Sequence, residues 1–274
     1  MASKIKKLIK SFLPPALAEL LRDQSGSCRY SGHYDNWLEA RKMTSGYDDK
    51  KILDKVLQSA IKVEKGEAVF ERDGVILEQI EYSWPLLAQL LLVAAKQDGK
   101  LNVLDFGGAF GTTYRQNQEY LQQLKAVTWN IVEQPQVVAA GQKNITEKNI
   151  RFWSSLDDCL AHEPVDLVIF AASLQYAEFP YDILGKIIAR GVENIVFDRV
   201  ILSASDDFVA IQFVPPCIYE ANYPIWIFNG DKLIKYFQGK GYRLLADFDD
   251  PINGSIKVDK LTADHRGLVF QRMK

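Results

Sequence analysis

The stretch from Asn102 to Thr112, Asn-Val-Leu-Asp-Phe-Gly-Gly-Ala-Phe-Gly-Thr, constrains the fold more than any other part of the chain. A short apolar run ends at Asp105, and glycines follow at positions 107, 108 and 111. This order predicts a buried strand that breaks into a tight turn and opens a helix. Because glycines lack a Cβ atom and a helix N-terminus has free N–H groups, a nucleotide-like ligand can approach the backbone there.

Two classes of ligand use such a turn. The dinucleotide fingerprint G-x-G-x-x-G fits poorly, because alanine and threonine stand at positions 109 and 112. The S-adenosylmethionine (SAM) pattern, acidic-x-G-x-G-x-G, is met at Asp105, Gly107 and Gly111 and missed only at Ala109. In these residues the chain resembles the class I SAM-dependent methyltransferases. A glycine turn can also serve chain reversal alone, so the other segments have to decide.

Composition narrows the class of protein. With 274 residues, 47% of them hydrophobic, the chain can form one α/β domain with an N-terminal extension. A net charge of −2 argues against a nucleic-acid partner. Neither the three cysteines nor the three histidines have the spacing of a disulfide framework or a zinc site, so we expect no metal and a cytoplasmic protein. No apolar run reaches the length of about eighteen residues that a membrane span needs.

Residues 1–80 form the predicted extension, which we expect to be helical and aromatic and to cap the substrate. Residues 3–13 have apolar side chains on one helical face and lysines on the other. Such a helix either makes peripheral contact with an anionic membrane or packs on its own domain, and it is not an export signal. The segment that follows is rich in tyrosine and tryptophan, whose rings either stack on a sugar or pack the extension onto the domain.

Residues 81–274 alternate between helical and apolar β patterns, as in a Rossmann-like, mostly parallel sheet of seven strands. An edge-like strand at 208–214 is followed by an aromatic block at 215–228, which interrupts the alternation, so we expect an insertion or lid near 205–229. No helix-length segment separates the final strands, 242–248 and 267–272, so a hairpin joins them and the last strand is antiparallel. In family terms, class I methyltransferases have this reversal and NAD-binding Rossmann domains lack it.

Cofactor contacts are expected where the parallel strands end. Glu133 follows the second strand, where a carboxylate either accepts ribose hydroxyls or caps the next helix. Asp157 either holds an adenine edge or caps its own helix. The predicted cofactor-binding residues are Asp105, Gly107, Gly108, Ala109, Gly111, Glu133, Gln134, Ser155, Asp157, Ser173 and Gln175.

The reaction zone is expected after the fourth and fifth strands. If the methyl acceptor is an oxygen, a base assists the transfer, and the candidate bases are His33, Tyr176 and Asp198. Each of these residues could instead have an ordinary structural role. The predicted substrate-binding residues are Tyr30, Tyr34, Trp37, Tyr47, Arg199, Tyr219, Tyr223 and Trp226.

Several motifs in order along the chain sharpen the resemblance. They are Trp37-x-x-Ala, Gly46-Tyr-Asp, Val103-Leu-Asp-Phe-Gly-Gly, Val132-Glu-Gln-Pro, Leu174-Gln-Tyr, Asp198-Arg and Tyr223-Pro-x-Trp. Together they resemble a bacterial methyltransferase family found among polysaccharide and lipopolysaccharide biosynthesis genes. The resemblance implies a SAM cofactor and an acceptor that is a sugar, a nucleotide sugar or a glycolipid intermediate. The alternatives are a non-catalytic scaffold with the same fold in a glycan assembly complex and, more distantly, an NAD-dependent sugar oxidoreductase.

Overall fold

The computed structural model describes residues 28–44, 50–219, 221–250 and 253–273. The predicted basic helix at 3–13 and Tyr47 lie outside the described residues. The helices are α3 (Trp37–Lys42), α4 (Lys50–Glu64), α5 (Trp84–Lys96), α6 (Thr112–Leu121), α7 (Pro135–Asn144), α8 (Leu156–His162), the short η1 (Leu174–Tyr176), α9 (Pro180–Ala189) and α10 (Gly230–Gly239). None of the described helices is long and apolar enough to cross a membrane.

The strands of the parallel core appear where the apolar runs predict them. They are β4 (Lys100–Phe106), β5 (Ala126–Val132), β6 (Ile150–Trp153), β7 (Leu167–Ala171), β8 (Asn194–Ser203), β11 (Tyr242–Asp249) and β13 (Leu261–Arg272). Their hydrogen-bonded order is β6-β5-β4-β7-β8-β13-β11. The first five are parallel, whereas β13 runs antiparallel to both β8 and β11. The predicted reversal of the last strand is therefore confirmed.

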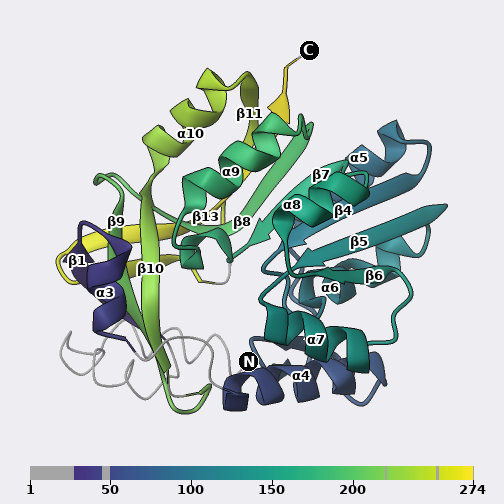
Figure 1. Cartoon of the computed structure of the whole chain (residues 1–274), viewed down its shortest axis with the longest axis horizontal. Helices are drawn as coiled ribbons and strands as arrows, with labels where there is room; N and C mark the ends of the chain where they lie inside the picture. Colours follow the sequence, from purple (N-terminus) through teal and green to yellow (C-terminus); the bar gives the residue numbers. More distant parts are fainter. Residues whose placement is uncertain (1–27, 45–49, 220, 251–252, 274) are drawn as a thin grey trace, which may run out of the picture.

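Helices cover both faces of this core (Figure 1). On one face, α5 and α6 pack against Leu101, Val103 and Ile169 in one apolar cluster. On the other, α8, α9 and α10 pack against Val168, Phe170 and other strand residues. Because each strand is buried on both sides, the runs read as continuous apolar stretches rather than as alternating ones.

Four more strands, β1 (Arg29–Tyr34), β9 (Phe208–Val214), β10 (Ala221–Asn229) and β12 (Ser255–Val258), bring the main sheet to eleven. They pair in a ring with the ends of β8 and β13, in the order β8-β10-β9-β1-β12-β13 and back to β8. Apolar side chains such as Ile201, Phe208 and Ile225 fill one cluster of this ring. The expectation of seven strands was therefore too low, because the aromatic block overlaps strand β10 and because β1, β9 and β12 also join the sheet.

Two more sequence expectations need correction here. The segment 208–214 is not an edge strand, because β9 lies between β1 and β10 and all but one of its residues are buried. The described part of the extension is mixed rather than helical, since residues 29–34 pair with β9 and β12. Residues 70–77 add a separate hairpin of β2 (Phe70–Arg72) and β3 (Val75–Leu77).

Candidate methyl-donor and acceptor site

The glycine turn joins β4 to α6 at the carboxyl edge of the parallel strands. Gly107 has a φ of +69° and packs so closely on β7's end that a Cβ atom would lie 2.6 Å from the Ser173 Cβ. A Cβ atom at Gly108 would lie 2.5 Å from an Asp105 carboxylate oxygen. These two positions accept no larger residue without a shift of their neighbours.

Ala109, the departure from the glycine pattern, lies in the left-handed backbone region that glycine adopts readily. Its φ is +48°, in the left-handed region that ordinary residues avoid at a cost of about 1–2 kcal/mol. The methyl group thus adds a steric cost that a glycine at this position would not have. The backbone N–H of Ala109 donates to Glu133 Oε1 at 3.2 Å, which ties the turn to the end of β5.

Two acids flank the turn, as predicted. Asp105 is fully buried and accepts a 3.0 Å hydrogen bond from the Trp129 indole, while its Oδ1 has no partner among the described residues. Burial raises the pKa of Asp105 to about 7. Glu133 accepts the N–H groups of Ala109 and Gln134, and burial raises its pKa as well, against the effect of these two bonds.

The predicted adenine-side residues have local partners. The Ser155 hydroxyl caps α8 by accepting the Asp158 N–H at 3.2 Å, so Ser155 rather than Asp157 is the capping residue. Asp157 is exposed and forms a 2.6 Å ion pair with Lys186 on α9. Ser173, by contrast, lies against Gly107, and its buried hydroxyl has no partner among the described residues.

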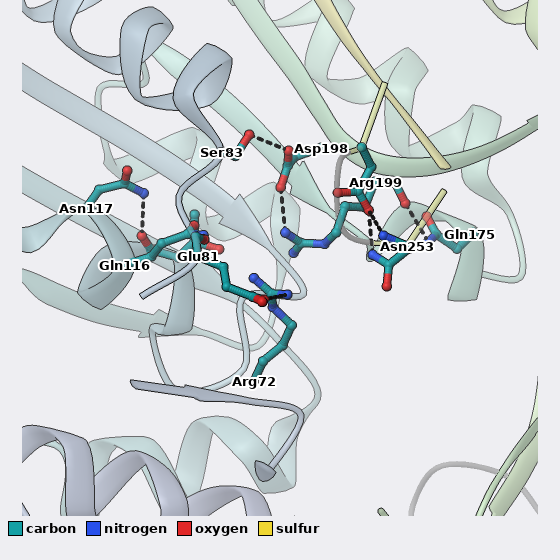
Figure 2. Close-up of polar contacts among 11 residues, drawn as sticks. Arg72, Glu81, Ser83, Gln116, Asn117, Gln175, Asp198, Arg199 and Asn253 are labelled. Atoms are coloured by element: carbon teal, nitrogen blue, oxygen red, sulfur yellow. Dashed lines mark hydrogen bonds and ion pairs between the residues drawn. The ribbon is translucent and has the colours of Figure 1, made fainter. Parts of the chain in front are cut away.

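Asp198 sits at the centre of a polar network (Figure 2), and it lies in the middle of β8, level with the carboxyl end of β7, rather than after the strand. Its Oδ1 accepts the Ser83 hydroxyl at 2.8 Å, and its Oδ2 pairs with Arg199 at 2.7 Å. Asp198 is only 3% exposed. Each oxygen of this carboxylate therefore holds one neighbour, Ser83 or Arg199, in place.

The backbone next to Asp198 is strained. Arg199 has a φ of +62° within β8, where the register against β13 shifts between Arg266 and Leu268. Its carbonyl accepts the amide of the buried Gln175 at 3.2 Å. Ala172, at the end of β7, is also left-handed and donates its N–H to the Asp198 carbonyl at 2.7 Å. Strained residues held in place by their surroundings often mark functional sites.

Tyr176 lies on η1, directly after β7. Its hydroxyl donates to Gln212 of β9 at 2.8 Å, and its ring meets the Tyr223 ring edge-on, with centroids 5.3 Å apart. Burial raises the pKa of Tyr176 well above its ordinary value, and the nearby Tyr30 and Tyr219 raise it further. The structure thus gathers four of the predicted site tyrosines from distant parts of the chain.

The remaining predicted substrate residues form a second aromatic group. The Trp37 and Trp226 rings stack with centroids 6.3 Å apart, and Tyr34 packs in the same cluster. His33 lies elsewhere: it is exposed and stacks on Phe208, with centroids 4.2 Å apart. Phe208 begins β9 and pairs with Ile227 near the carboxyl end of β10, not with the glycine turn. The structure therefore separates His33 from the other candidate bases.

Several residues of this region were not predicted from the sequence. Glu71 of β2 accepts the Thr112 hydroxyl at the start of α6, and the adjacent Arg72 pairs with Glu81 at 3.1 Å. Ser83 stands at the N-cap position of α5, yet its hydroxyl bonds Asp198 rather than a backbone N–H of the helix. The charged residues after Phe70 were the only sequence signal for this contact, but they did not indicate which distant element they would contact.

No family model and no curated protein matches the chain. Similar solved structures include the N-terminal domain of EvdMO1 in the presence of S-adenosylhomocysteine (SAH) and D-fucose, with a TM-score of 0.48, 13% identity and coverage of 81% of this chain and 97% of that one. A SAM-dependent methyltransferase from Clostridium acetobutylicum has a TM-score of 0.43 and 12% identity, with coverage of 71% and 94%. The amino pentose methyltransferase CalS10 from Micromonospora echinaspora has a TM-score of 0.42 and 11% identity, with coverage of 70% and 92%.

These structural neighbours are SAM-dependent methyltransferases. At such identities and TM-scores the likeness is distant, and it decides neither the ligand nor the reaction of this chain.

Proposed function

We propose that this chain is a SAM-dependent methyltransferase. One observation carries the proposal: a glycine turn with an acid on either side lies at the carboxyl edge of a parallel sheet whose last strand is antiparallel. In open α/β sheets, ligands bind at this edge. An NAD-dependent oxidoreductase is less well supported, because both the glycine spacing and the reversed strand depart from what it needs.

The residues present fit a bound SAM. The Asp105 Oδ1 and Ser173 Oγ atoms are buried without partners among the described residues, which is a costly state that a polar ligand or a water relieves. Glu133 uses one lone pair of each oxygen for the turn, so further acceptor positions remain for ribose hydroxyls. Asp105 and Glu133 would thus hold the nucleoside side, and the turn backbone would adjoin the methionyl side.

When bound, SAM supplies a methyl group activated by a sulfonium. The protein's part in such a displacement is to align the acceptor with that methyl group and to exclude water. Gln175 and Tyr176 lie after β7, at the edge of the sheet where an acceptor would lie. The Gln175 amide is held by the Arg199 carbonyl, and the Tyr176 hydroxyl is held by Gln212. The O–H of Tyr176 donates to Gln212, so the phenol oxygen would position an acceptor by accepting a hydrogen bond from it rather than by taking a proton.

We further propose a carbohydrate acceptor, that is, a sugar, a nucleotide sugar or a glycolipid intermediate of surface polysaccharide synthesis. The support is the gathering of tyrosine rings with the buried amide of Gln212 at the acceptor side, since flat apolar rings with polar tips suit sugars. A cytoplasmic location is also a proposal that rests on the sequence alone. Contact of residues 3–13 with an anionic membrane is an alternative to their packing on the domain.

A catalytically silent scaffold is the second candidate. It is favoured by the state of the three predicted bases: Asp198 has both oxygens engaged, Tyr176 is held protonated, and His33 lies away from the turn. The absence of a free base does not exclude methyl transfer to every acceptor, because a neutral amine attacks through its own lone pair and needs no base.

The two candidates are separated by SAM turnover. Conversion of SAM to SAH would be measured with a panel of sugars, amino sugars and nucleotide sugars, for wild type, Glu133→Gln and the exposed control Glu67→Gln. The methyltransferase proposal expects acceptor-dependent SAH release that falls at least about tenfold in Glu133→Gln, because a charged hydrogen bond is lost, and is unchanged in Glu67→Gln. SAM binding without turnover on any acceptor would favour the scaffold.

A further inference from the structure

Two arginines from distant parts of the chain meet beside the proposed site. Arg72 ends β2, and Arg199 lies in the strained part of β8. Figure 2 shows their guanidinium groups pointing toward one another from opposite sides of the network. Like charges repel, so a fold brings two guanidinium groups together only where other groups offset their charge.

Each arginine has a single carboxylate partner among the described residues. Arg72 pairs through Nη1 with Glu81, and Arg199 pairs through Nη1 with Asp198. The second oxygen of Asp198 accepts the Ser83 hydroxyl, and no hydrogen bond joins Asp198 to Arg72 among the described residues. A guanidinium has five N–H donors, so these pairs leave most of the donors unused.

The unused donors include a buried one. Arg72 Nη2 has no partner among the described residues although water does not reach it. Leaving such a group unpaired is unfavourable. Burial lowers the pKa of Arg72, and the charge of Arg199 is the next contributor. If the ion pairs only held the hairpin in place, this buried and unpaired donor would remain unexplained.

The pair lies next to the proposed donor site. Glu71, which precedes Arg72, accepts the hydroxyl of Thr112 at the start of α6, directly after the glycine turn. On the other side, the charge of Arg199 lowers the pKa of Asp105, opposing the effect of burial. Both arginines therefore belong to the same edge of the sheet as the turn.

We propose that Arg72 and Arg199 together bind one anionic group, a carboxylate or a phosphate, that the ligand brings into this site. This inference rests on the proposed function, and the group is either the methionyl carboxylate of the donor or an acidic group of the acceptor. Planar guanidinium groups bind both anions through paired hydrogen bonds. The buried Arg72 Nη2 gains its partner in this way.

Calorimetric titration of the full chain tests the inference with three probes: SAH, 5′-methylthioadenosine, which lacks the methionyl carboxylate, and inorganic phosphate. The variants are Arg72→Met, Arg72→Lys and the control Arg243→Met on the exposed face of β11. Arg72→Lys keeps the positive charge but loses the paired N–H donors of the guanidinium group. Circular dichroism and the Tm of each variant report folding. Arg72 is suited to replacement because its partner Glu81 is 36% exposed and can be hydrated when left alone.

If the anion is the donor's carboxylate, Arg72→Met weakens SAH at least about tenfold and leaves 5′-methylthioadenosine unchanged. If it belongs to the acceptor, both nucleosides bind as before and phosphate binding is lost. Arg72→Lys should keep only part of the affinity in either case. Equal weakening of both nucleosides in a folded variant, or no change for any probe, overturns the inference. If wild type binds neither nucleoside, the proposed function fails, while Arg72-dependent phosphate binding still supports the anion site.

Discussion

Replacing Asp105 with asparagine should stabilise the protein at alkaline pH, although Asp105 belongs to the proposed donor site. Burial raises the pKa of this carboxyl from its ordinary value of 3.8 to about 7. The folded state therefore holds the proton more strongly than the unfolded state does. The resulting stability is fully present below about pH 4, declines as the pH rises, and is lost above about pH 7.

The rise of roughly three pKa units corresponds to about 4 kcal/mol at pH 8. In Asp105→Asn the side-chain carbonyl can keep the Trp129 hydrogen bond, and the amide takes the place of Oδ1, which already lacks a partner among the described residues. We therefore expect the variant to be about 3 kcal/mol more stable than wild type near pH 8, and this difference to shrink to about half or less near pH 5.

Urea denaturation at several pH values measures both curves, with Asp98→Asn as the control, because Asp98 is exposed and pairs with Lys125 at the surface. The control should follow wild type throughout. If Asp105→Asn also follows wild type at every pH, the reasoning about the buried charge is refuted. If it gains stability and at the same time loses SAH affinity, Asp105 is kept for binding at a cost in stability.

Three further substitutions have defined outcomes. Gly108→Ala should lower the free energy of unfolding by about 1–3 kcal/mol, because the new Cβ would lie 2.5 Å from the Asp105 carboxylate; equal urea midpoints would contradict the geometry. Asp198→Ala should cost about 3–5 kcal/mol by leaving a buried guanidinium unpaired, which thermal unfolding would measure, and a change under 1 kcal/mol would mean that the network is loose. Tyr176→Phe should cost about 1 kcal/mol through the lost bond to Gln212 and, once an acceptor is known, should raise KM more than it lowers kcat; an unchanged KM would remove Tyr176 from the acceptor site.

The parallel core could be predicted from the sequence because its signals are local. Apolar runs, glycine-marked turns and helical spacing placed β4 to β8 and the reversed last strand close to where they lie. The carboxyl ends of parallel strands meet at one edge, so the pattern also predicted that Asp105, Glu133 and Asp198 would share it.

The ring of strands could not be predicted in the same way. β1 is short and partly exposed, and its pairing with β9 and β12 depends on residues far apart along the chain. Similarly, no glycine marks the left-handed backbone at Ala172 or Arg199, since surrounding contacts rather than local preference impose it. The contact between Ser83 and Asp198 could not be predicted for the same reason, because the two residues are far apart along the chain and only the fold brings them together.

The central claim, that the glycine turn binds a methyl donor, is tested most directly by titrating SAH and NAD separately into the purified chain by calorimetry. The Gly107→Arg variant is the control, because its side chain would fill the space against Ser173. Our account predicts SAH binding in the micromolar range that Gly107→Arg abolishes, and no binding of NAD. Binding of NAD without SAH, or of SAH with equal affinity to Gly107→Arg, would contradict it.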